Sequence, residues 1–177
     1  MITKKSPNRP RPKKHIRAAI VTLTALLVLA ICFVALRDRT PILTRTKLEE
    51  RWEQWRTLRV PSYTLTLTVE RDKSAAEKYE VYVRENEVES FSINGQQRPN
   101  NSSYSIDGLF AILDRELEIT EGKDKQTESA LRNALLKAVF DEKYAFPQNF
   151  KRIAGKGQSC FIRVDKFAPL NQTEKNK

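Results

Sequence analysis

The hydrophobic pattern of this chain begins with one long, uninterrupted apolar stretch. Residues 18–36, AAIVTLTALLVLAICFVAL, contain no charged residue, no proline and no glycine, and Thr22 and Thr24 are their only polar side chains. A helix that rises about 1.5 Å per residue needs roughly twenty such residues to cross a bilayer core of about 30 Å. The stretch from Ala18 to Leu36 therefore predicts a single transmembrane helix.

The charges on either side of this stretch predict its orientation. Residues 1–17 hold seven basic side chains, three prolines and no acid, so we expect a disordered arm. Residues 37–45 form a short linker broken by Pro41, and the basic residues around it are fewer and are accompanied by acids. Basic residues next to a span stay in the cytoplasm. We therefore predict a single-pass protein of the plasma (cytoplasmic) membrane, with a cytoplasmic N-terminus and an extracytoplasmic domain.

Two other interpretations of the apolar stretch stay open. A cleaved secretory signal normally ends in small residues before the cut, and no A-x-A site follows this apolar core. A lipoprotein signal would place its lipidated cysteine at Cys32, but the bulky Ile31 stands where that signal has a small residue. An uncleaved anchor fits the pattern best.

Alternation of apolar and polar residues predicts β-strands further along the chain. In residues 62–71, Tyr63, Leu65, Leu67 and Val69 fall on one face, and threonines and a glutamate fall on the other. The same alternation predicts strands over residues 79–84 and 87–93, the latter with a bulge, closed by Asn94-Gly95. These three strands form a meander. Shorter strands are expected over residues 137–140, 149–154 and 159–167.

Helical spacing of apolar residues predicts up to three helices in the same domain. The first begins with a capping box at Thr46 and runs to Leu58, and the second runs over residues 106–117 behind Ser105 as its N-cap. A third is expected over residues 127–136. The pattern favours an α+β domain over residues 46–168, an antiparallel meander sheet of about five to six strands packed by one to three helices, with a polar tail over residues 169–177.

Charge and histidine content narrow the classes of function. The net charge of +10 falls mostly on the arm, and residues 37–177 carry only +3 without a basic stripe, so we expect no nucleic-acid partner. The single histidine, His15, lies in the arm, which excludes Ser-His-Asp or Cys-His catalysis and His/Cys zinc sites from the domain. We expect no cofactor, no metal and no enzymatic activity. Cys160 is either a buried small hydrophobe or a lone thiol able to cross-link a partner.

Two groups of aromatic residues are the candidate partner contacts. Trp52 and Trp55 share one face of the first predicted helix with Leu48. Tyr144, Phe146, Pro147 and Phe150 form an aromatic corner beside a proline. Each group has two interpretations: a surface that binds a partner, or an apolar face that packs into the core.

The order of several short motifs resembles that of a known family. Trp52 precedes Tyr63-Thr64-Leu65, and Ser105-Ile106-Asp107-Gly108-Leu109-Phe110 is followed by Val139-Phe140-Asp141 and Tyr144-Ala145-Phe146-Pro147. Over residues 48–167 the chain resembles a family of small exported or membrane-anchored bacterial envelope proteins known as a domain of unknown function. The resemblance implies an exported or anchored α+β domain, and it implies no activity, cofactor or catalytic residue.

Three hypotheses for function follow, ordered by how well the sequence supports them. The first is a membrane-anchored, non-enzymatic envelope module that binds a protein or the cell wall. The second is a carrier or sensor of a small apolar ligand held between sheet and helix. The third is a hydrolase that uses carboxylates alone, which would need two buried acids in one cleft.

Overall fold

A computed structural model describes residues 40–72, 74–123, 129–155 and 157–170 of the chain. The predicted arm (residues 1–17), the predicted span (residues 18–36) and most of the predicted tail lie outside these residues. In the part that is described, no helix is both long enough and apolar enough to cross a membrane.

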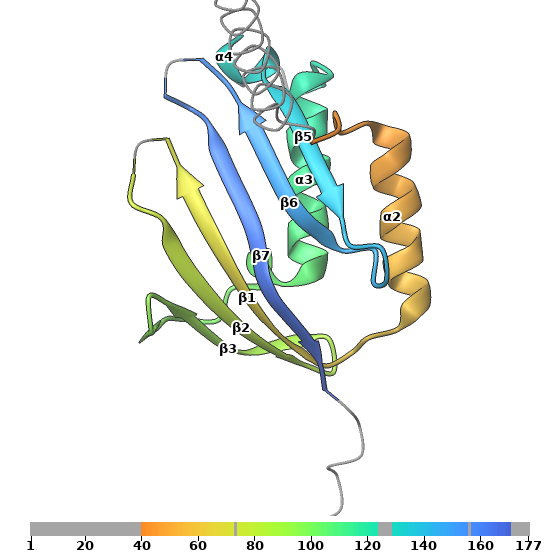
Figure 1. Cartoon of the computed structure of the whole chain (residues 1–177), viewed down its shortest axis with the longest axis vertical. Coiled ribbons are helices and arrows are strands. Elements are labelled where there is room, and N and C mark those ends of the chain that lie inside the picture. Colours follow the sequence, from red (N-terminus) through yellow and green to blue (C-terminus); the bar gives the residue numbers. More distant parts are fainter. Residues whose placement is uncertain (1–39, 73, 124–128, 156, 171–177) are drawn as a thin grey trace, which may run out of the picture. The chain divides into compact units, whose positions relative to one another are not determined.

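A single antiparallel sheet of seven strands forms the body of the domain (Figure 1). The α+β class is confirmed, with one strand more than expected because two residues after the Asn94-Gly95 turn also pair. The order across the sheet is β4-β3-β2-β1-β7-β6-β5. The strands are β1 (Tyr63–Arg71), β2 (Glu77–Arg84), β3 (Glu87–Ile93), β4 (Gln96–Gln97), β5 (Leu135–Phe140), β6 (Pro147–Ile153) and β7 (Cys160–Pro169).

The last strand joins two meanders into this one sheet. β1, β2 and β3 form the predicted meander, with the predicted irregularity at the pairing of Tyr82 and Val83 with β3. β5, β6 and β7 form a second meander, and β7 pairs along the whole of β1, with Leu67 opposite Val164. Sequence periodicity shows which residues share a face, but pairing between strands about a hundred residues apart is set by tertiary packing.

Two helices cover one face of the sheet. These are α2 (Arg45–Leu58) and α3 (Ile106–Thr120), and Figure 1 shows α3 behind the strands, with no described helix on the side toward the viewer. Apolar side chains from α3 and from every second strand residue meet in one core, in which Leu67, Phe110 and Leu113 are fully buried. Burial of this kind supplies most of the free energy that holds such a domain together.

The start of α3 confirms one predicted cap and shows why a glycine is needed there. The Ser105 hydroxyl oxygen accepts a hydrogen bond from the Gly108 N–H at 3.1 Å. A short 3-10 helix (Ser102–Tyr104) packs against this turn so closely that a Cβ on Gly108 would lie 2.1 Å from the Ser102 carbonyl oxygen. Only glycine fits at this position without displacing the backbone.

Three local predictions are wrong. The N-cap of α2 is Thr44, whose side chain accepts from the Lys47 N–H at 3.3 Å, and not Thr46. The third predicted helix is reduced to α4 (Ser129–Arg132), because the residues after it alternate into the core as β5, with Leu136 and Ala138 buried. The strand predicted to start at residue 149 begins earlier, at Pro147, since a shift in the strand register beside this proline accommodates its missing N–H.

The predicted linker also has structure at its end. Ile42 forms an antiparallel bridge with Lys137 on β5, the edge strand. The Leu43 N–H donates to the Leu136 carbonyl at 2.9 Å, and the Ala138 N–H donates to the Pro41 carbonyl at 3.1 Å. The chain therefore enters the domain along the β5 edge and covers polar backbone groups that an edge strand would otherwise expose.

Candidate binding cleft

The structure places most of the predicted contact residues in the core. Trp55 and Phe146 are each 4% exposed, Phe150 is 2% exposed and Pro147 is buried, whereas Trp52 and Tyr144 are half-buried. Packing into the core, the second interpretation, holds for Trp55, Phe146, Pro147 and Phe150. Their side chains offer little surface to a partner, and a contact role for the half-buried Trp52 and Tyr144 stays a prediction.

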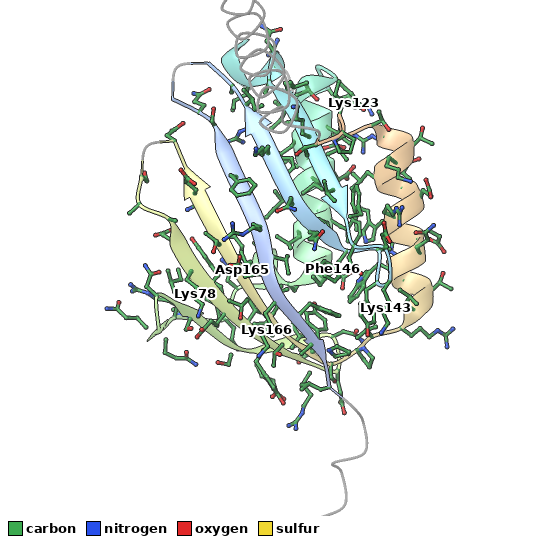
Figure 2. All side chains as sticks on the ribbon, in the orientation of Figure 1. Lys78, Lys123, Lys143, Phe146, Asp165 and Lys166 are labelled. Atoms are coloured by element: carbon green, nitrogen blue, oxygen red, sulfur yellow. The ribbon has the colours of Figure 1, made fainter. Side chains whose placement is uncertain are left out.

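The two aromatic groups meet around Phe167, a residue that no local sequence motif singles out. The ring of Phe167 on β7 lies 6.0 Å from Trp55, 5.1 Å from Tyr144 and 4.7 Å from Phe146, measured between ring centroids. Figure 2 shows Phe146 and Lys143 near the end of α2 that carries Trp55. This aromatic cluster ties α2, β7 and the β5–β6 turn together.

An open cleft of about 490 Å³ lies beside this cluster, at the C-terminal end of α2. It is bounded by the last turn of α2, the loop that leads into β1, the β2–β3 turn and the first turn of α3. Its lining residues are Trp55, Arg56, Arg59, Val60, Pro61, Asn86 and Asp107. The cleft thus combines two arginines with an apolar wall.

Backbone geometry builds the cleft from two tight turns. Arg59 ends α2 in the left-handed conformation, with a φ of 47°, which turns the chain sharply into Val60 and Pro61. Glu85 and Asn86 form the β2–β3 turn with φ values of 51° and 70°, as two-residue hairpins require. The Asn86 N–H donates to the Pro61 carbonyl at 2.8 Å. This bond holds the two turns together as opposite walls.

The charged side chains that line the cleft sum to a net positive charge. The Trp55 indole N–H donates to an Asp107 carboxylate oxygen at 3.2 Å, and the Arg56 guanidinium lies 4.4 Å from the centre of the Trp52 ring. No side chain among the described residues pairs with the Arg59 guanidinium. Arg59 is also exposed. A ligand with an acidic group and a small apolar surface matches this arrangement.

Tyr63 connects the core beneath the cleft to the start of α3. Its hydroxyl oxygen accepts a hydrogen bond from the Ile106 N–H at 2.9 Å, one of the backbone donors that a helix start leaves without a partner. Burial disfavours the phenolate and raises the pKa of Tyr63 to about 12. The hydroxyl therefore stays protonated and fixed at neutral pH.

A second polar cluster lies at the opposite end of the sheet, where β1 ends. Arg71 donates to the Glu77 carboxylate at 3.0 Å and to the Tyr104 hydroxyl at 2.6 Å. Tyr79 donates to Glu77 at 2.7 Å, and burial raises the pKa of Tyr79 to about 12. These bonds join β1 and β2 to the segment before α3, so the cluster has a structural role.

A separate ion pair lies between α3 and the sheet. Arg152 on β6 pairs with Glu116 on α3, and both side chains are mostly buried, at 20% and 13% exposure. Burial raises the pKa of the Glu116 carboxyl, partly offset by the Arg152 charge. Cys160 lies beside the pair, half-buried, and burial raises the pKa of its thiol. The thiol is thus held in its protonated, less reactive form.

In the segments that the structure describes, no group of three or more His, Cys, Asp or Glu side chains is arranged to hold a metal ion. Among those segments, Glu116 is the acid whose pKa is raised, and it pairs with Arg152. The carboxylate pair that a hydrolase would need is not formed around it.

Comparison with known proteins adds one structural similarity. No protein-family model and no curated protein sequence matches the chain. Among solved structures, the chain is similar to the crystal structure of MucB in complex with MucA(peri), with 13% sequence identity and a TM-score of 0.35. The match covers 70% of this chain and 55% of the matched one, so the chain spans about half the length of that protein. At this level of similarity, function has to be inferred from the chain's own residues.

Proposed function

We propose that this protein is a membrane-anchored, non-enzymatic binding module whose cleft beside Trp55 holds an acidic segment of a partner protein in the cell envelope. The anchor is the apolar stretch Ala18 to Leu36. The single observation that carries the proposal is the cleft itself, in which the exposed Arg59 guanidinium stands next to the half-buried Val60 and Pro61.

The composition of the cleft favours a protein segment over a small apolar ligand. An apolar ligand would be held in an enclosed cavity between sheet and helices, but Leu65, Phe110 and Leu113 fill that space and are at most 1% exposed. The cleft is instead open to solvent, and arginine is a residue that recurs in the centres of protein interfaces. A short segment with one carboxylate and one apolar side chain would satisfy both of its walls.

The position of the cleft in the domain suits an anchored receptor. The chain enters the domain at Thr40, near the N-terminal end of α2, and the cleft lies at the other end of that helix. Fourteen helical residues separate the two ends by about 21 Å. The cleft therefore lies away from the point of attachment and stays accessible to a partner.

Photo-crosslinking in cells tests this function. A benzoylphenylalanine is placed at position 56 in the full chain, so that Arg59 is kept, and a matched one at position 98. Arg56 lines the cleft, and Arg98 is equally an exposed arginine but lies beyond β4. We expect a protein adduct from position 56 only, and the attached peptide to contain an acidic residue. Adducts to cell-wall glycan would favour the cell-wall interpretation, and equal adducts from both positions, or none, would refute a specific site in the cleft.

A further inference from the structure

The helix-free face of the sheet carries a compact apolar corner. Four large hydrophobic side chains are exposed in the described residues, and three of them lie together: Ile42 at 62%, Leu135 at 40% and Ile153 at 45%. Leu135 and Ile153 are opposite each other on β5 and β6. We call these three residues, with the half-buried Phe161, the corner patch.

Strand register places all four side chains of the corner patch on the face away from the helices. Leu136 and Ala138 are buried against the helices, so Leu135 and Lys137 point the other way. Residues that are opposite each other share a face, and Ile42 is opposite Lys137 while Phe161 is opposite Lys151. Figure 1 shows no described helix over this side of β5, β6 and β7.

Two lysines lie within the corner patch. Lys137 and Lys151 are opposite each other on β5 and β6, between the apolar residues, and the Lys151 ammonium lies 5.4 Å from the centre of the Phe161 ring. Glu70, opposite Phe161 on β1, lines one hollow with Lys151, Ile153 and Phe161. Apolar side chains interleaved with lysine are the composition of surfaces that rest on anionic lipid headgroups.

The chain connection keeps the corner patch close to a membrane. Only five residues lie between the end of the predicted span, Leu36, and Ile42, and the six Cα–Cα steps reach at most about 20 Å when fully extended. Ile42 is itself part of the corner patch and is fixed to β5 by the backbone bonds on either side of it. Interfacial headgroups extend about 5–8 Å beyond the hydrocarbon core. The short tether therefore brings the corner patch within reach of them.

We propose that the corner patch docks on the anionic lipid surface of the membrane that holds the anchor, so that the sheet edge at β5 rests on the headgroups. This inference rests on the anchoring part of the proposed function and is independent of the cleft. It gives the anchored domain a preferred orientation, because the corner patch lies at the N-terminal side of α2 and the cleft at the other end. Docking thus presents the cleft outward.

Reconstitution of the full chain tests the docking. The protein is inserted into vesicles of phosphatidylcholine with or without phosphatidylglycerol, with benzoylphenylalanine at position 153 or, as the matched control, at position 58. Leu58 is also 45% exposed but lies at the far end of α2. We expect lipid adducts at position 153, several-fold above position 58, and more in the anionic vesicles. Changing Lys137 and Lys151 together to glutamate should lower the adduct yield by about fivefold or more.

Each other outcome has a distinct meaning. Protein that does not float with the vesicles would overturn the anchor, and the docking with it, without bearing on the cleft. Floating protein without a lipid adduct at position 153 would overturn the docking alone. Adducts from position 153 to residues 1–39 or to a second copy of the chain would show that protein, and not lipid, covers the corner patch, which also overturns it.

Discussion

The indole N–H of Trp55 donates a hydrogen bond to the carboxylate of Asp107, at a distance of 3.2 Å between nitrogen and oxygen. The bond joins the last turn of α2 to the first turn of α3, two segments that are 52 residues apart in sequence. The Trp55 ring also makes edge-to-face contacts with Phe167 and Tyr63, with centroids 6.0 Å and 5.8 Å away. The floor of the cleft is therefore held by both polar and aromatic contacts.

Removal of this hydrogen bond should destabilise the domain measurably. Trp55→Phe keeps an aromatic ring but loses the N–H, and we expect the free energy of unfolding to fall by about 1–2 kcal/mol. Trp52→Phe is the control, because the Trp52 indole nitrogen is buried without a hydrogen-bond partner in the described residues. Urea unfolding should show the smaller loss for Trp52→Phe, and equal losses would contradict a stabilising role for the Asp107 bond.

Tyr63 should make the stability of the domain fall as the pH rises through the alkaline range. Tyr63→Phe leaves the Ile106 N–H buried without an acceptor, which should cost about 1–3 kcal/mol at neutral pH. Folding raises the pKa of Tyr63 from 10.0 to about 12, so its contribution is fully present below pH 10 and is lost as the pH rises through about 12. Between these pH values, thermal unfolding should show a smaller loss of stability with rising pH in Tyr63→Phe than in the wild type. The pH dependence that remains comes from Tyr79, whose pKa is also raised. An unchanged slope would contradict this assignment.

Loss of Arg152 should lower the stability of the domain at neutral pH and lower it less at acidic pH. Arg152→Met leaves the mostly buried Glu116 carboxylate without its counter-charge, at a cost of about 2–4 kcal/mol. The pKa of Glu116 is already raised above 4.5 and should rise further in the variant. Protonation then removes the buried charge as the pH falls, so the deficit should shrink. The double variant Glu116→Gln/Arg152→Met should recover much of the loss, and a pH-independent deficit would show that the charge is not its cause.

Arg59 should be a position where stability and binding oppose each other. Its φ of 47° is costly for a side chain with a Cβ and suits glycine, so Arg59→Gly should stabilise the domain by about 1 kcal/mol. The same change removes the exposed guanidinium and should weaken capture of the partner. Denaturation and crosslinking yield, measured on the same preparation, separate the two effects. A variant that is both more stable and equally able to bind would leave Arg59 without a role in the cleft.

Local patterns predicted the elements of the fold but not their arrangement. Ser105 as a cap and the alternation of Tyr63 to Val69 are short-range signals, and the structure reproduces both. The residues before β5 have helical spacing, yet burial of Leu136 and Phe140 in the core outweighs that local preference. The order of strands depends on contacts between distant segments, which no local pattern encodes.

The cleft was harder to predict than the fold, for a related reason. The sequence predicts aromatic residues beside turns as contacts, but rings of this size gain most free energy when buried, and Trp55, Phe146 and Phe150 are buried. The sequence pattern predicts the end of the first helix at Leu58 and the two strands that flank Glu85-Asn86. What brings Arg59 to the surface of a cleft is the bond between that turn and Pro61, and this bond exists only in the folded chain.

The central claim is that an acidic protein segment occupies the cleft, and quantitative co-purification tests it most directly. The full chain is purified from its native membrane as wild type, Arg59→Glu and the control Arg98→Glu, and the bound proteins are compared by mass spectrometry. We predict that at least one protein is retained by the wild type and by Arg98→Glu and falls by about tenfold or more with Arg59→Glu, as loss of a charge-assisted hydrogen bond implies. The same set of bound proteins in all three preparations, with each variant folded, would contradict the account.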